Sequence, residues 1–191
     1  IASHEGLAPE ETEDFLDALS RALTPRIPDP FPRICIRGST SHLGAFARVL
    51  WDVGYRDAEP ADEAILVASF VMPASAYHPW LADDIPHTPV IFSDQAIIVG
   101  PRVTPGDGPC LQCVWENRAK AEPALVALAT QLSTRSAATD TQAQHALAAW
   151  HTRSLLRAQT PGLTYRIDRY TGEVSHHQED ASSSCLCRSL A

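Results

Sequence analysis

Two close cysteine pairs, far apart in the sequence, constrain the fold of this chain more than any other feature. Cys110 and Cys113 stand two residues apart on a stretch flanked by proline and glycine, and Cys185 and Cys187 form a second pair near the end of the sequence. Two such pairs can supply the four thiolates of a tetrahedral zinc site with Zn–S distances of about 2.3 Å. Because four thiolates leave no open position for water, we expect this zinc to be structural and to staple the tail onto the middle of the fold.

The sequence leaves two alternatives to zinc open. The cysteines could form one or two disulfides, or an isolated redox pair. A disulfide within Cys185-Leu186-Cys187 would be strained, and a redox Cys-x-x-Cys normally opens a helix after a strand. His176 and His177 offer a substitute ligand, or else belong to an exposed polar linker. Cys35 lies in an apolar run and is interpreted as a small buried hydrophobe.

The composition narrows the possible partners and the compartment. The chain has 191 residues, of which 45% are hydrophobic, which suits one domain or one domain with part of another. Its net charge is −8 and Lys120 is the only lysine, so we expect neither a nucleic-acid nor a membrane partner. Five cysteines, with neither a signal peptide nor a long apolar run, indicate a cytoplasmic protein.

The first 32 residues are predicted to be separate from the rest. Residues 9–24 are expected to form a helix, because acidic side chains follow Pro9 and four apolar residues recur at helical spacing. The proline-rich residues 25–32 are expected to form a stiff linker. We interpret residues 1–24 as the terminal helix of a preceding domain and 33–191 as the main domain.

The main domain is predicted to be an α/β domain with a Rossmann-like, mostly parallel sheet and an antiparallel extension. The alternation of apolar runs predicts strands at 34–36, 64–68 and 89–92, and helices at 43–54 and 75–83. The run at 96–99 is expected to start the antiparallel part. Beyond Cys113 we expect helices at 122–132 and 142–159, a mobile polar loop at 133–141 between them, and a hairpin over 163–174.

The loop Gly38-Ser39-Thr40-Ser41-His42-Leu43-Gly44 is the natural place for a nucleotide. A phosphate-binding turn needs glycines where the backbone approaches the phosphates at a helix N-terminus. Here only the outer positions are glycine, so Gly38, Ser39 and Gly44 are at most the remnant of such a loop. The alternative is a plain turn whose hydroxyls cap the helix. His78, His87, His145 and His151 have no paired spacing that predicts a site.

Several short motifs resemble the ThiF/MoeB-type, ubiquitin-activating-enzyme-like superfamily. They are residues 85–90 (IPHTPV), 99–106 (VGPRVTPG), 109–113 (PCLQC) and the tail pair at 185–187. The resemblance implies a Rossmann-like sheet, ATP-dependent adenylation of a carboxylate and a structural zinc on two cysteine pairs. It is greatest to the cyclodehydratase partner, or precursor leader-peptide-binding, proteins of thiazole/oxazole-modified peptide clusters. That branch works beside a YcaO-type enzyme and grips the leader with a winged-helix-like clamp.

The departures from this family concern adenylation. Thr40 and Ser41 stand where two loop glycines belong, and the second buried strand ends in Ser69-Phe70-Val71 without the acid that holds magnesium. Arg48 is the nearest candidate for the phosphate-binding cations. A triphosphate without cationic and metal partners would be poorly stabilised in the transition state. We therefore expect zinc but not ATP as a cofactor, and no catalytic residues in this chain.

The sequence thus favours a non-catalytic zinc-containing scaffold. We expect it to recruit a precursor leader peptide, to dock on a YcaO-type cyclodehydratase and to form a homodimer. An active adenylating enzyme and a zinc-stabilised oligomerisation module are the alternatives.

Overall fold

The computed structural model describes residues 32–187. The predicted helix at 9–24 and all but the last residue of the proline-rich linker lie outside this range. In chain order the elements are β1 (Ile34–Gly38), α2 (Leu43–Asp52), β2 (Glu63–Ser69), α3 (Ala74–Ala82), β3 (His87–Phe92), β4 (Ala96–Val99), α4 (Leu111–Ala121), α5 (Ala124–Leu132), α6 (Gln142–Ala158), β5 (Leu163–Asp168) and β6 (Val174–Gln178).

The six strands form one sheet in sequence order, β1 to β6. β1, β2 and β3 pair in parallel, whereas the pairings β3–β4, β4–β5 and β5–β6 are all antiparallel. The expected α/β class and the antiparallel start at residue 96 are confirmed. The expectation of a mostly parallel sheet is wrong, because β4, β5 and β6 belong to the same sheet and three of its five pairings are antiparallel.

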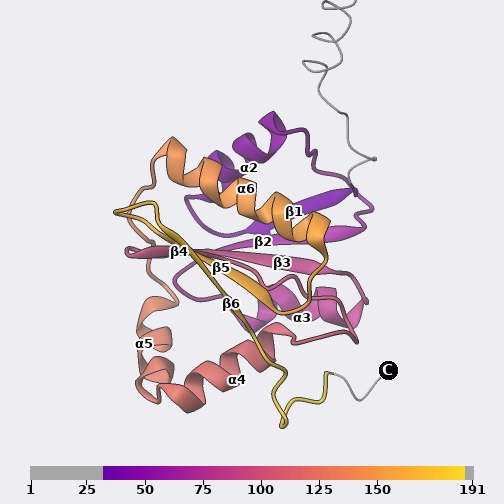
Figure 1. The fold of residues 1–191 in the computed structure, drawn as a ribbon, viewed down its shortest axis with the longest axis vertical. Coiled ribbons are helices and arrows are strands. Elements are labelled where there is room, and N and C mark those ends of the chain that lie inside the picture. The colour runs from indigo at the N-terminus through magenta and orange to yellow at the C-terminus, as the bar shows by residue number, and fades with distance from the viewer. Residues whose placement is uncertain (1–31, 188–191) are drawn as a thin grey trace, which may run out of the picture. The chain divides into compact units, whose positions relative to one another are not determined.

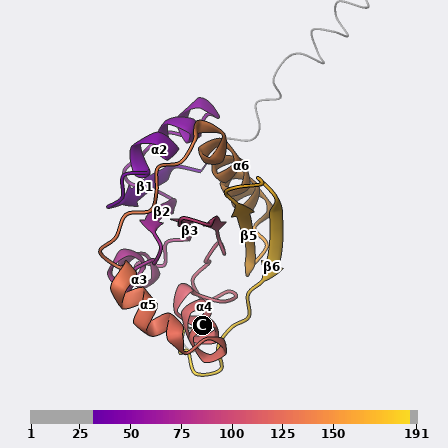
Figure 2. The same cartoon turned by 90° about the vertical axis from the view of Figure 1, so that its left-hand side faces the viewer.

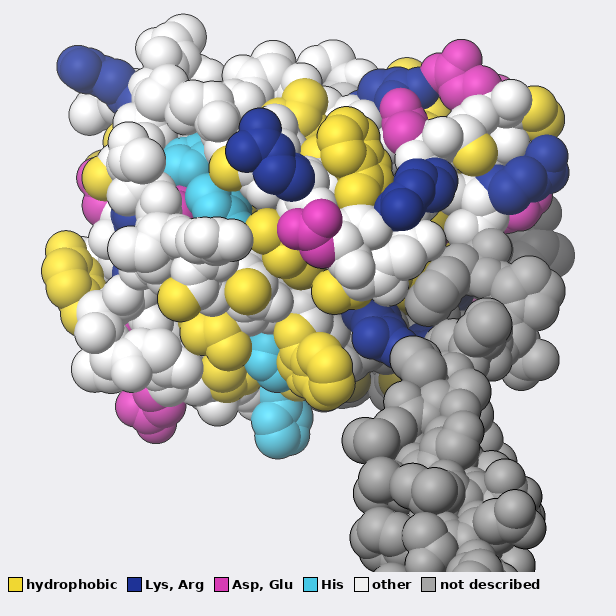
Figure 3. Space-filling model, turned by 90° about the horizontal axis from the view of Figure 1, so that it is seen from above, with side chains coloured by type: hydrophobic (Ala, Val, Ile, Leu, Met, Phe, Trp, Pro, Cys, Tyr) yellow, Lys and Arg dark blue, Asp and Glu magenta, His cyan; other side chains and the backbone are white. Residues whose placement is uncertain are grey.

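Helices cover both faces of this sheet. α2 and α6 pack against each other on one face, and α6 also contacts β3, β4 and β5 (Figures 1 and 2). α3, α4 and α5 lie on the other face. Seen from the α2–α6 side, hydrophobic and basic side chains are mixed on the surface (Figure 3). Trp51 of α2 and Trp150 of α6 are 42% and 60% exposed, so this face carries two solvent-accessible indoles.

The strand and helix limits follow from local chemistry. β2 is buried along almost its whole length, as a strand between two parallel neighbours must be. α6 begins at a capping box: Thr141 Oγ1 accepts from the Gln144 N–H at 3.3 Å, and Gln144 Oε1 accepts from the Thr141 N–H at 2.7 Å. It ends at Gln159, which adopts a left-handed conformation with φ 49°. The predicted helix at 142–159 is confirmed by these two caps.

One helix was missed by the sequence analysis. The stretch that carries Cys110 and Cys113 passes directly into α4, which begins at Leu111. Cys110 is extended (φ −85°, ψ 173°) and occupies the N-cap position without a capping side-chain hydrogen bond. Leu111 and Val114 are buried on the inner face of the helix. Arg118 and Lys120 lie in the last turn, where basic side chains interact favourably with the negative end of the helix dipole. These cations and the absence of Gly and Pro were the signals available in the sequence.

A buried ion pair explains the arginine in the Val-Gly-Pro-Arg motif. Arg102 holds Glu63, at the start of β2, through both carboxylate oxygens: Nε lies 2.8 Å from Oε1 and Nη2 lies 3.1 Å from Oε2. Glu63 is only 3% exposed. Burial raises the pKa of Glu63, although the bonds to Arg102 oppose that shift. This motif therefore ties the chain after β4 to the parallel part of the sheet.

Candidate metal centre

The four predicted ligand cysteines meet at one end of α4. Cys110 precedes the helix, Cys113 lies in its first turn, and Cys185 and Cys187 return on the tail after β6. Cys110 and Cys113 are 3% and 0% exposed, and the tail cysteines are partly buried. Tyr77 of α3 and several apolar side chains pack around the group. The cluster is thus an extension of the core beneath the sheet.

The sulfur positions suit one tetrahedral ion. The Sγ–Sγ distance is 3.7 Å between Cys110 and Cys113 and 3.6 Å between Cys110 and Cys185. Cys113 and Cys187 are 3.5 Å apart, and all four sulfurs lie within 4.8 Å of one another. A tetrahedron with Zn–S bonds of about 2.3 Å has edges of about 3.8 Å. Only small movements are therefore needed to place a zinc ion among these thiolates.

The same packing disfavours isolated thiolates. Burial raises the pKa of Cys110, and burial together with the neighbouring thiol of Cys113 raises the pKa of Cys187 to about 11. Burial also acts to raise the pKa of Cys113, but backbone hydrogen bonds from Ser182 and Cys110 and the neighbouring thiols hold it below its usual value. A bound cation removes this conflict, because it favours deprotonated thiols.

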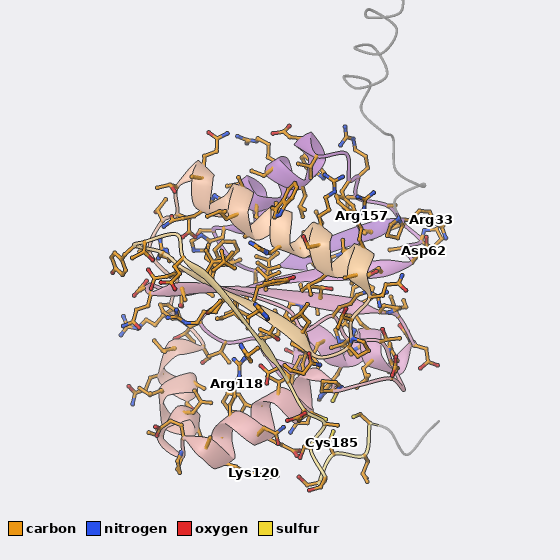
Figure 4. All side chains as sticks on the ribbon, in the orientation of Figure 1. Arg33, Asp62, Arg118, Lys120, Arg157 and Cys185 are labelled. Carbon is orange, nitrogen blue, oxygen red and sulfur yellow. The ribbon has the colours of Figure 1, made fainter. Side chains whose placement is uncertain are left out.

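Side chains of α4 hold the tail independently of sulfur. Glu116 accepts hydrogen bonds from the hydroxyls of Ser182 and Ser184, each at 2.6 Å. These bonds lower the pKa of Glu116 to about 2. The Asn117 side chain donates to the Asp180 carbonyl at 2.8 Å. Figure 4 labels Arg118 and Lys120 on this helix and Cys185 on the tail.

Arg118 and Lys120 complete this contact. Arg118 forms an ion pair with Glu179, which is 8% exposed and also lies 2.9 Å from His177 Nε2. Lys120 donates to the Ser184 hydroxyl at 3.2 Å. The tail from residue 179 to residue 187 is therefore fixed along α4, and this contact brings Cys185 and Cys187 to the first cysteine pair.

The structure also bears on the other interpretations of the cysteines and of the nearby histidines. All five cysteines are free thiols, and Cys35 is buried in β1, as expected for a small hydrophobe. The Cys-x-x-Cys does open a helix, as a redox pair normally does, so its position alone does not exclude a redox role. The proximity of a second pair is what favours a metal over a redox site. His176 and His177 lie on β6 and are not among the grouped ligands.

The first loop is largely filled by its own side chains. Thr40 hydrogen-bonds with Ser69 at 2.7 Å. The His42 ring stacks on Phe92 with centroids 4.7 Å apart and is 3% exposed. Both contacts occupy the edge of the sheet beside the loop, where the glycines of a nucleotide-binding turn would leave room.

The two loop glycines have different local environments. A Cβ on Gly38 would lie 2.2 Å from the Val67 carbonyl oxygen, so close packing of β1 on β2 explains this glycine without a ligand. A Cβ on Gly44 would meet nothing within 4 Å. Ser39 is exposed. Of the three residues singled out for a nucleotide, only Gly38 has a packing reason, whereas Ser39 and Gly44 have none.

An apolar groove lies on the face covered by α3, α4 and α5. It has a volume of 470 Å³, and its lining includes Phe70, Met72, Ile91, Trp115, Leu125 and Val126. α5 buries only Ala129, and it exposes Val126 and Leu128 by 51% and 48%. A helix that is apolar on all sides normally contacts other protein on more than one face. This surface therefore has the character of a contact site.

A second polar cluster was not foreseen. His42, Asp140 and His145 come together under α2 and α6, although the histidines have no spacing that predicts a site. The loop at 133–141, expected to be mobile, buries Ala137 and the Asp140 side chain. No local signal in the sequence links a residue before α2 with one before α6.

The fold is shared with solved heterocyclase and microcin synthetase structures, while the sequence matches no family model and no curated protein. The chain is similar to the heterocyclase TruD, with a TM-score of 0.60 and 16% identity over 95% of this chain and 34% of that one. For a heterocyclase in complex with substrate and cofactor the TM-score is 0.62, with 14% identity over 96% of this chain and 32% of that one.

A third similar structure is a chain of the E. coli microcin synthetase McbBCD complex. Its TM-score is 0.56, with 12% identity over 92% of this chain and 76% of that one. The chain spans about a third of the length of the two heterocyclases. At such identities the likeness establishes the fold alone. The class defined here is a mixed α/β domain with a four-cysteine cluster that could hold a metal.

Proposed function

We propose that this chain is a non-catalytic, zinc-containing scaffold of azole-peptide biosynthesis. It recruits a ribosomally made precursor peptide and docks on a YcaO-type cyclodehydratase. The likeness to heterocyclase and microcin synthetase structures supports the setting. The proposal that the chain is non-catalytic rests on the loop after β1. There Thr40 contacts Ser69 and His42 stacks on Phe92, at the sheet edge where a nucleotide would bind.

The proposed zinc ion has a scaffold role. Cys110, Cys113, Cys185 and Cys187 would hold it, and four thiolates leave no position for a reacting water. The ion would reinforce the polar contact between the tail and α4. Zinc analysis of the wild type and of Cys113→Ser tests this part, and we expect the variant to hold one zinc ion fewer per chain than the wild type.

Docking on the cyclodehydratase is assigned to the apolar groove and α5. Partner contacts favour apolar patches poor in charge at their centre, and Arg118 is the only charged residue that lines the groove among the residues described. Val126 and Leu128 extend the apolar surface beyond it. The similar McbBCD chain is itself part of a multi-protein complex. A cyclodehydratase with a complementary apolar helix or loop is the proposed occupant.

Leader recruitment is assigned to the segment before residue 33. The predicted helix at 9–24 would be the last helix of a winged-helix-like clamp, as the resemblance implies. Charge substitutions at Phe15 and Leu19 in the whole chain should weaken binding of a labelled leader peptide. Unchanged affinity would move the peptide site elsewhere.

Reconstitution tests the proposal directly. The cyclodehydratase from the same gene cluster is incubated with precursor peptide and Mg·ATP, with and without this chain, and azole rings are counted by mass spectrometry as lost water. We expect this chain to accelerate ring formation. The double variant Val126→Asp/Leu128→Asp should lower that effect, whereas Trp150→Asp on the opposite face should not. Equal rates with and without the chain would contradict the scaffold role.

The adenylation alternative is tested by calorimetry with Mg·ATP. Saturable binding in the micromolar range, on the order of −8 kcal/mol, would favour an active enzyme over a scaffold. No heat of binding is the expected result. Light scattering of the same sample tests the proposed homodimer and the oligomerisation alternative.

A further inference from the structure

A buried cluster on the α2–α6 side of the sheet takes no part in the proposed scaffold function. His42 precedes α2, Asp140 precedes the cap of α6, and His145 lies in the first turn of α6. The side chains of these three residues are 3%, 0% and 5% exposed. Arg169, which follows β5, contacts Asp140 from the other side. Three segments far apart in the sequence therefore bring these groups to one point.

The distances among the three ligand atoms suit a shared cation. Asp140 Oδ2 lies 2.7 Å from His42 Nδ1 and 4.0 Å from His145 Nε2. The potential ligand atoms all lie within 4.8 Å of one another. Bonds of about 2.0–2.2 Å to nitrogen and oxygen place neighbouring ligands about 3.0–3.4 Å apart, between the two measured distances. A small rotation of His42 away from Asp140 and of His145 toward it would produce that spacing.

The His145 ring has an unused nitrogen at this point. His145 Nε2 is buried and has no hydrogen-bond partner among the described residues. A buried ring nitrogen without a partner is costly and calls for an explanation. At 4.0 Å from the Asp140 carboxylate it is too far for a hydrogen bond. A cation between the two atoms would satisfy both.

The surrounding groups fix the ligands as outer partners of a metal site do. Arg169 Nε lies 2.7 Å from Asp140 Oδ1, so one carboxylate oxygen is oriented and the other is left for the cation. Arg169 in turn donates to the carbonyls of Ser93 and Thr139, each at 3.0 Å. Phe92 holds the plane of the His42 ring by stacking at an interplanar angle of 11°.

An adjoining cavity gives access. It has a volume of 330 Å³, and His42, Asp140 and His145 line it together with Ser41, Arg48 and Gln142. Three protein ligands leave coordination positions open, and here they would face this cavity. Two imidazoles and one carboxylate are the donors that zinc and iron(II) accept in such open sites.

From this geometry we propose that His42, Asp140 and His145 form a second metal site, separate from the cysteine cluster, that binds a divalent transition-metal ion of the zinc class. The site holds its ion with an open position toward the cavity. Arg169 is a positioning residue that acts through Asp140. The proposal concerns residues that the scaffold function leaves unused, and it stands or fails separately from that function.

Metal counting tests the site. The whole chain, freed of metal and kept reduced, is titrated with Zn²⁺ by calorimetry, and bound zinc is measured after desalting. We expect two ions per chain for the wild type and one for His145→Gln. His151→Gln, on the same helix outside the cluster, should keep two. One ion in the wild type, or two in His145→Gln, would overturn the proposal and leave the cluster as a buried tether of the loop.

A spectroscopic titration separates the two sites if the variant is less stable. Co²⁺ bound by cysteines absorbs through sulfur-to-metal charge transfer, and Co²⁺ bound by histidine and aspartate does not. We expect His145→Gln to keep the charge-transfer band and to lose one equivalent of bound cobalt. Arg169→Gln should weaken the second equivalent about 10- to 100-fold. Loss of the charge-transfer band together with the second equivalent would mean that the fold, not the site, had been removed, and unchanged binding in both variants would refute the site.

Discussion

Cys113 Sγ, in the first turn of α4, lies 3.5 Å from Cys187 Sγ, 74 residues further along the chain. Between the two residues the chain forms most of α4, then α5, α6 and the β5–β6 hairpin. The contact therefore closes a long loop that contains two of the six strands of the sheet.

Replacement of Cys113 by serine should remove zinc and destabilise the fold. Metal binding at a structural site contributes directly to folding. We expect a loss of about 3 kcal/mol in the free energy of unfolding, which corresponds to a melting temperature lower by roughly 6–12 °C. The matched control is Cys35→Ala, which should keep one zinc at the cysteine cluster. Unchanged zinc content and melting temperature in Cys113→Ser would remove the zinc claim.

The ion pair between Arg102 and Glu63 should behave as a coupled unit. Arg102→Met leaves a buried carboxylate without its partner, which costs roughly 3–5 kcal/mol. The double variant with Glu63→Gln should recover at least about 1 kcal/mol of that loss, because no charge is then left unpaired. Urea unfolding of the single and double variants measures the coupling. Strict additivity would show that the two side chains do not depend on each other.

The two glycines of the first loop should respond in opposite ways to alanine. Gly38→Ala places a Cβ against the Val67 carbonyl, so we expect it to lower stability by about 2 kcal/mol or more. Gly44→Ala meets open space within a helix and should raise stability by up to about 1 kcal/mol. Chemical denaturation compares the two. A destabilising Gly44→Ala would point to a role for this glycine that packing does not reveal.

Stability should decrease as the pH falls below about 6.5, the value for an unfolded histidine. His87 is 0% exposed, and burial lowers its pKa, although its hydrogen bond with the Ile85 carbonyl opposes the shift. Below the unfolded value, the unfolded chain binds more protons than the folded chain, so protonation favours unfolding. Burial also lowers the pKa of His145 and His151, which adds to this slope.

Denaturation midpoints measured between pH 5 and 8 check this pH dependence. His87→Leu should reduce the slope relative to the wild type, at equal zinc content. His78→Gln, at an exposed position on α3, should leave it unchanged. Equal slopes for the wild type and His87→Leu would show that the buried ring at position 87 is not among the titrating groups.

Local patterns predicted those elements that depend on local chemistry. The buried run at 64–68 predicted β2, the pattern over 142–159 predicted α6, and the segment 163–174 was correctly expected to form a hairpin. The cysteine spacing likewise predicted that four sulfurs would meet, because a metal requirement acts over any sequence distance. α4 was not predicted, because the two cysteines were interpreted only as metal ligands, although helix-forming residues follow them.

The rest depends on contacts that no short stretch of sequence contains. The antiparallel half of the sheet is decided by β4 pairing with β5, some 70 residues away, and this pairing replaces the parallel neighbour expected for a Rossmann-like fold. In the same way His42 and Asp140 are ordinary polar residues of two loops until the fold brings them within 2.7 Å of each other. Their burial is a property of the folded layers, not of their neighbours in sequence.

The tail contact also sets an order of events during synthesis. Cys110 emerges from the ribosome 75 residues before Cys185, so the first pair must wait for the second while α5, α6 and the hairpin are made. A nascent chain interrupted in this interval would present two free thiols and the uncovered side of α4 to the cellular quality-control machinery. Metal capture by the complete site would therefore mark the molecules whose translation has passed residue 187.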